Sequence, residues 1–150
     1  MTRTVPPRAL ISELCISFVD PNYKEYSCES PEEATYKTPN YYVLLGERII
    51  ANSFATMLRS VIDTLYDLDS SIIINMAAND EQIVSGSQNI MFSFNQDKTT
   101  GGGQKIHNTD IYESTGFSAS HIMYIIQALL DRYDIDRSDF VYSARSTKSQ

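Results

Sequence analysis

The stretch Arg48-Ile49-Ile50-Ala51-Asn52-Ser53-Phe54-Ala55-Thr56-Met57-Leu58 joins a predicted strand to a predicted helix. Asn52 or Ser53 can cap the helix, because a side-chain oxygen at this position accepts hydrogen bonds from backbone N–H groups of the first turn. Apolar residues then recur on one side, at Phe54, Leu58, Val61, Ile62 and Leu65. This spacing predicts an amphipathic helix that ends near residues 67–69 and buries one face.

A second helix is predicted after Gly116-Phe117, with Ser118 as its N-cap. Phe117 and Ile122 have the spacing of a hydrophobic staple, in which the residue before the cap packs on the fourth helical residue. One apolar face follows, formed by Ile122, Ile125, Ile126, Leu129, Leu130 and Tyr133. Residues 134–136 are expected to end this helix. Both helices therefore have one face suited to covering a sheet.

Alternating and apolar runs predict the strands. Residues 8–19 include an alternation of Leu14, Ile16 and Phe18 with smaller or more polar residues, which favours a strand. Residues 41–51 are typical of a hairpin, because two apolar runs flank Gly46-Glu47. A glycine at the first central position suits a type II′ turn. Further strands are predicted at residues 90–94 and 139–143.

Two segments between these elements are less regular. At residues 70–74 a β-branched run favours a strand, but its position directly after a helix also allows a short second helix. Residues 95–105 are predicted to be a flexible connection, with Gly101-Gly102-Gly103 at a hairpin tip. The return strand is then expected at Ile106 or at residues 111–113.

The order of elements predicts an α+β fold, with an antiparallel sheet of about five strands and two main helices packed on it. The chain of 150 residues is expected to form a single domain. Loose ends are predicted at residues 1–7 and 144–150, and a long polar loop rich in Tyr and Glu at residues 20–40.

Composition excludes several classes of function. The chain has 12 Lys and Arg against 19 Asp and Glu, a net charge of −7. This balance disfavours a general nucleic-acid binder, which needs a basic face. No apolar run approaches the ~20 residues of a membrane span. We therefore expect a cytoplasmic protein with no direct nucleic-acid or membrane partner.

No catalytic, metal or cofactor motif is complete. Cys15 and Cys28, expected to be half-buried and exposed, have no zinc-site spacing. His107 and His121 lack a nucleophile with an orienting third group. The acidic run from Asp134 lacks the glycine and the closing glutamate of a calcium loop. The glycines at 101–103 do not fit a phosphate-binding loop. We therefore predict no catalytic residue, no metal, no cofactor and no enzyme activity.

Tyrosines and glutamates are concentrated between residues 23 and 42. Tyrosine provides a large contact area at a low entropic cost and is enriched in protein interfaces. Acidic side chains between the tyrosines can oppose the basic groove of a partner. A loop folded against its own sheet is the structural alternative. The predicted partner-binding residues are Tyr23, Tyr26, Glu29, Glu32, Glu33, Tyr36 and Tyr41.

Two segments resemble halves of a small accessory domain found in prokaryotic restriction and defence proteins. The first runs from Arg48 through Ser53-Phe54 to Leu65-Tyr66, and the second from Ile111 through Ser118-Ala119 to Tyr133. The resemblance covers about residues 42–142. It implies a domain without an assigned catalytic residue that acts beside nuclease or helicase-like parts.

Three functions follow as hypotheses. The first is a non-catalytic protein–protein interaction module, or small subunit, in a prokaryotic defence or phage–host conflict. The second is an acidic inhibitor, similar in action to an anti-CRISPR protein, that blocks the nucleic-acid channel of a defence enzyme. The third is a small enzyme of unknown chemistry. In the first two the partner is another protein, with a nuclease or other nucleic-acid enzyme as one candidate.

Overall fold

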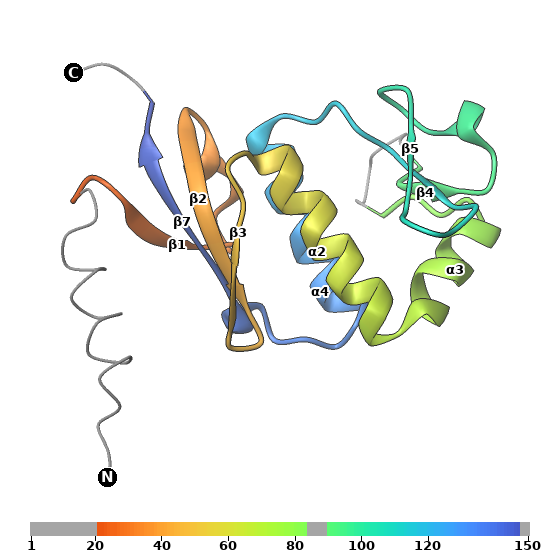
Figure 1. Ribbon diagram of the computed structural model, residues 1–150, viewed down its shortest axis with the longest axis horizontal. Coiled ribbons are helices and arrows are strands. Elements are labelled where there is room, and N and C mark those ends of the chain that lie inside the picture. Colours follow the sequence, from red (N-terminus) through yellow and green to blue (C-terminus); the bar gives the residue numbers. More distant parts are fainter. Residues whose placement is uncertain (1–20, 84–89, 148–150) are drawn as a thin grey trace, which may run out of the picture.

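The computed structural model describes residues 21–83 and 90–147. The predicted strand at residues 8–19, with Cys15, and the loose end at 1–7 lie outside these residues. The predicted α+β class is confirmed, but the strands form two antiparallel sheets of four and three strands rather than one of about five. Helices α2 and α4 lie between the larger sheet and the part of the chain that holds α3 and the smaller sheet (Figure 1).

The larger sheet has the order β1-β7-β2-β3, with every neighbouring pair antiparallel. Its strands are β1 (Lys24–Ser27), β7 (Phe140–Ser146), β2 (Lys37–Leu44) and β3 (Glu47–Ile50). The prediction of a long loop at 20–40 is therefore wrong, because β1, a 3₁₀ turn at Pro31–Ala34 and the start of β2 occupy it. The predicted loose end at 144–150 is wrong as far as Ser146, since β2 pairs with β7 to that residue.

The β2–β3 hairpin is confirmed, but its turn differs from the predicted one. Leu44 pairs with Glu47, so the central residues are Leu45 and Gly46 rather than Gly46 and Glu47. Both have positive φ, 52° and 84°. Two positive φ values define a type I′ turn, whose twist matches that of the strands. The prediction placed Gly46 at the first central position of the turn, whereas it occupies the second.

Both predicted main helices are present. Helix α2 (Phe54–Leu68) is capped by Ser53, whose side chain accepts a hydrogen bond from the Thr56 N–H. Helix α4 (Ala119–Arg132) is capped by Ser118, which accepts from the His121 N–H. The two helices run in the same direction, because Tyr133 at the end of α4 donates a hydrogen bond to the Asp69 carbonyl at the end of α2.

Residues 70–74 belong to helix α3 (Ser70–Ala78), so the preference for a strand is wrong. The Asp69 side chain accepts a hydrogen bond from the Ser71 N–H and caps the new helix directly after α2. Ile73, Met76 and Ala77 are buried, at the i, i+3, i+4 spacing of a helix face. The cap and this burial outweigh the modest helix penalty of β-branched residues.

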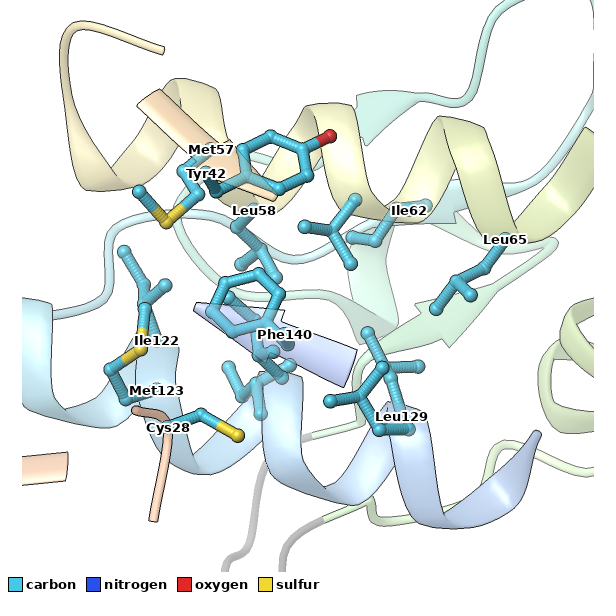
Figure 2. Packing of buried hydrophobic residues seen from close by; sticks show 14 of the residues in the cluster. Cys28, Tyr42, Met57, Leu58, Ile62, Leu65, Ile122, Met123, Leu129 and Phe140 are labelled. Carbon is cyan, nitrogen blue, oxygen red and sulfur yellow. The ribbon is translucent and has the colours of Figure 1, made fainter. Parts of the chain in front are cut away.

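Much of the core lies between the inner face of the larger sheet and helices α2 and α4, and it continues to α3 and the smaller sheet through residues such as Ile73 and Phe92. Figure 2 shows Phe140 of β7 next to Leu58 of α2, with Ile62 and then Leu65 following along the same helix and Leu129 of α4 below them. Cys28 is fully buried in this core, so its predicted exposure is wrong. It directly follows β1, and its carbonyl accepts a hydrogen bond from the Gln127 amide of α4, which holds it inside.

The smaller sheet has the order β4-β6-β5 and strands of two residues each. They are β4 (Phe92–Ser93), β6 (Tyr112–Glu113) and β5 (Gln104–Lys105). Residues 111–113 thus supply the expected return strand. The glycines at 101–103 are not a hairpin tip, because they lead from β4 to β5, and β6 separates these two strands. A free tip would make few contacts, whereas Thr115 bonds through its hydroxyl to the Gly101 carbonyl.

Candidate functional site

The seven predicted partner-binding residues do not form one surface. Tyr26 faces inward, where its ring stacks on that of Tyr142 with the centroids 5.5 Å apart. Tyr41 projects from the opposite, outer face of the sheet, because it precedes the buried Tyr42. Tyr23 lies beside Arg145, whose guanidinium is 5.8 Å from the ring centroid.

The acidic members of the predicted set mostly contact other parts of the same chain. Glu29 forms an ion pair of 2.9 Å with Arg137. Glu32 accepts a hydrogen bond of 2.5 Å from the Tyr124 hydroxyl of α4, which lowers the pKa of its carboxyl. Glu33 accepts a hydrogen bond from Lys37 at its backbone carbonyl, and Tyr36 lies exposed beyond it. The bond from Tyr124 docks the 3₁₀ turn on α4, and the Arg137 pair ties Glu29 to the segment just before β7.

The outer face of the larger sheet combines polar and apolar side chains from β1, β2 and β3. The Tyr41 hydroxyl donates a hydrogen bond of 2.7 Å to Glu25 of β1. On the other side the Arg48 guanidinium of β3 lies over the Tyr41 ring, 4.1 Å from its centroid. Ile50 follows on the same face and is 75% exposed. This row ends at β3, which is an edge strand among the described strands.

A second surface, the α2 groove, lies between α2 and the segment that follows β5. The groove has a volume of about 340 Å³. Asp63 and Asp67 line it from one turn of α2 to the next, and His107 lines it from the opposite side. Partial burial raises the pKa of the Asp63 carboxyl. Tyr66, Ile106, Asn108 and Thr109 complete the lining.

Glu113 of β6 is the most unusual titratable group of the described residues. Its side chain is 1% exposed, and its Oε1 atom has no hydrogen-bond partner. Burial raises the pKa of its carboxyl to about 8, although Arg59 on α2 opposes that rise. A buried carboxyl is normally paired, so this one stands out chemically.

Sequence reasoning overlooked Glu113 and the α2 groove. One signal was present: Ile111 and Glu113 are two positions apart in a predicted strand, and alternation places them on the same face. Since Ile111 is buried, Glu113 is buried too. The groove had no such signal, because Asp63 and His107 are far apart in the sequence.

Over residues 21–83 and 90–147, no group of three His, Cys, Asp or Glu side chains is placed to hold a metal ion. Within the same residues no helix is both long and apolar enough to cross a bilayer. No protein-family model, curated protein or solved structure matches this chain.

Proposed function

We propose that this chain is a non-catalytic protein-interaction module that binds an extended segment of a partner protein alongside strand β3. The observation that carries the proposal is the open β3 edge, next to an outer face with exposed apolar and cationic side chains. The mode of binding is strand addition, in which backbone hydrogen bonds supply affinity and side-chain contacts supply specificity.

The hydrogen-bonding register of the β2–β3 hairpin determines which backbone N–H and C=O groups of β3 point away from β2. The Ala51 N–H donates to the Asn40 carbonyl across the strand pair, and Glu47 pairs with Leu44 at the turn. Alternate residues of an antiparallel strand point their backbone groups in opposite directions. Residues 47, 49 and 51 therefore face β2, while Arg48 and Ile50 direct N–H and C=O groups outward. Among the described strands, none pairs with this side of β3.

The side chains beside this edge indicate the chemistry of the partner. The Ile50 side chain is exposed to water in the free chain, so burying it against an apolar residue of a partner would be favourable. Arg48 lies on the Tyr41 ring and has no ion pair within the described part of the chain. An extended segment with an apolar residue opposite Ile50 and a carboxylate opposite Arg48 is complementary to both.

A cross-linking experiment tests the proposal. A photo-reactive residue is placed at position 50 or, as a control, at Leu68, an exposed apolar residue at the end of α2. We expect a protein captured from cells of the source organism through position 50 and not through 68. Ile50→Lys should weaken its binding about tenfold or more, while Leu68→Lys should not. Hydrogen exchange at the Arg48 and Ile50 amides should slow in the complex.

Three results would overturn the proposal. Capture at position 68 alone would place the interface elsewhere. Capture of a second copy of this chain would indicate self-association through β3. Binding that leaves exchange at Arg48 and Ile50 unchanged would exclude strand addition.

The setting in prokaryotic defence remains part of the proposal and rests on the resemblance alone. The acidic inhibitor remains its alternative, and salt separates the two. A complex held by opposite charges weakens steeply as salt rises, whereas backbone pairing and apolar contact persist. Loss of the captured nucleic-acid enzyme at high salt would favour the inhibitor.

A further inference from the structure

A small cavity adjoins Glu113, separate from the surface beside β3. It lies between the first half of α2, the segment after β6 and the start of α4, and has a volume of about 30 Å³. A volume of this size holds a small polar group or a water molecule rather than a large ligand. Its walls include Leu58, Arg59, Glu113, Gly116, Phe117 and Ile122.

One residue in the wall of this cavity has a buried polar atom without a partner. Glu113 lines it with a carboxyl that is almost fully buried and whose Oε1 has no partner. An acceptor left unpaired in this way destabilises the folded chain. A glutamine or a methionine would fill this position at similar size without an ionisable group. No described group donates a hydrogen bond to this oxygen, and the cavity beside it has room for a small donor.

Two charged side chains of α2 act on the Glu113 carboxyl, and they shift its pKa in opposite directions. Arg59 and Asp63 stand one turn apart on α2 and both influence Glu113. No ion pair joins Arg59 to Glu113, and the Arg59 side chain is exposed at the rim. His107 acts on Asp63 from across the α2 groove. Arg59 influences both carboxyls, but it is exposed and forms an ion pair with neither.

We propose that this cavity binds a primary ammonium group at the end of an unbranched apolar chain, as in a lysine side chain or an alkylamine. The ammonium donates hydrogen bonds to the Glu113 carboxylate, and Asp63 adds a second favourable charge. Because about 30 Å³ holds only the ammonium group, the methylene chain extends out of the cavity past the half-buried Phe117. An anion fits less well, because Asp63 repels it and the buried acceptor would stay unpaired.

Binding an ammonium group is coupled to loss of a proton. Because the pKa of Glu113 is raised to about 8, the free protein at pH 7 holds this carboxyl mostly neutral. The cation stabilises the ionised form, so the proton leaves Glu113 for the buffer when the amine binds. Release should approach one proton per amine at pH 7 and vanish well above pH 8, where Glu113 is already ionised.

The test is a calorimetric titration of the whole chain with n-butylammonium at millimolar concentrations, in buffers of different ionisation enthalpy. Butyrate, which has the same chain and the opposite charge, is the matched ligand. We expect butylammonium to bind with release of close to one proton at pH 7, and butyrate not to bind. NMR spectra should show shifts at Gly116 and Phe117 on addition of the amine.

Two variants separate this site from a merely structural carboxyl. Glu113→Gln keeps the shape of the neutral acid but cannot ionise, so it should lose about tenfold or more in amine affinity and all proton release. Arg59→Gln removes a competing cation at the rim and should strengthen binding. A structural role alone would leave amine binding unchanged in both variants.

The proposal is overturned if butylammonium does not bind at tens of millimolar, or binds without proton release. It is also overturned if butyrate binds instead, or if Glu113→Gln binds the amine as well as the parent chain. These outcomes are independent of the surface beside β3, since Ile50→Lys leaves the cavity unchanged.

Discussion

The two sheets of this protein are stabilised in different ways. In the larger sheet β2 and β7 pair over seven positions, and alternate side chains such as Tyr42 and Phe140 fill the core beneath. In the smaller sheet each strand has two residues. The backbone hydrogen bonds between such short strands are too few to stabilise the sheet by themselves. Side-chain hydrogen bonds to the backbone of neighbouring segments supply what the ladder lacks.

Ser114 illustrates how the smaller sheet is held. Its hydroxyl donates to the Ile90 carbonyl at 2.6 Å and accepts from the Thr100 N–H at 3.0 Å, joining segments on both sides. Near β4, Asp80 accepts a hydrogen bond from Ser93 and forms an ion pair of 2.7 Å with Lys98. Many similar contacts stabilise the larger sheet, so we expect a single substitution to have little effect there. The smaller sheet depends on a few side-chain hydrogen bonds, such as those of Ser114 and Asp80.

The largest expected effect concerns Glu113 in the smaller sheet. A carboxyl whose pKa is raised on folding favours the folded state when protonated, and this advantage is lost as pH rises from the unfolded value of 4.5 through about 8. Glu113→Gln cannot ionise at this position, so the variant does not lose stability in this way as pH rises. The unfolding free energy of the variant, relative to the parent chain, should rise on the order of 4 kcal/mol between pH 5 and pH 9.

Urea unfolding at the two pH values measures this difference. The comparison at pH 5 is the internal control, because Glu113 is neutral in the folded parent chain there and the amide replaces it at similar size. A constant difference between parent and variant across this pH range would show that Glu113 reaches water or a partner in solution. The Glu113 carboxyl would then not be the buried ionisable group that distinguishes the smaller sheet from the larger one.

The next effect compares two adjacent glycines in the connection from β4 to β5. A Cβ at Gly101 would lie 2.2 Å from the Thr115 carbonyl oxygen, while a Cβ at Gly102 would meet no atom within 4 Å. Both have positive φ, so alanine is strained at either position. Gly102→Ala should cost about 1 kcal/mol, and Gly101→Ala about 2–3 kcal/mol more, because backbone must move.

Thermal unfolding of the two alanine variants provides this comparison directly. Equal losses of stability would mean that the segment at 101–103 is free of Thr115 in solution, as the hairpin-tip prediction assumed. A larger loss for Gly101→Ala would confirm that the close approach of this glycine to residues 114–116 stabilises the smaller sheet.

The same contrast explains what sequence could predict of the fold. The periodicity that predicts α2 and α4 is a property of each segment alone, and so are the caps at Ser53 and Ser118. The helix at Ser70 depends on a cap from Asp69 and on burial of Ile73, which β-branched propensity does not contain. The smaller sheet depends on pairs such as Ser114 with Ile90, which no local pattern encodes.

Predictions for the functional site were limited for a related reason. The abundance of Tyr and Glu predicts a binding surface between residues 23 and 42. Which of these side chains can contact a partner depends on their bonds within the fold. Glu32 bonds to Tyr124, 92 residues away, and Glu29 to Arg137, 108 residues away. Glu113 was predictable as a buried position from alternation with Ile111. That it lacks a partner depends on the whole fold.

The smallest effect tests the turn of the larger sheet. Leu45 has a φ of 52°, a left-handed conformation that costs a non-glycine residue about 1–2 kcal/mol, and asparagine tolerates it better. Leu45→Asn should therefore raise the unfolding free energy by about 0.5–1 kcal/mol, measured by urea unfolding at pH 7. Half of the Leu45 surface is exposed, so little core packing is lost. A decrease in stability would show that leucine packing outweighs the strain. A gain would mean that the native turn retains a costly exposed leucine beside the β3 edge, which a partner contact at the hairpin would explain.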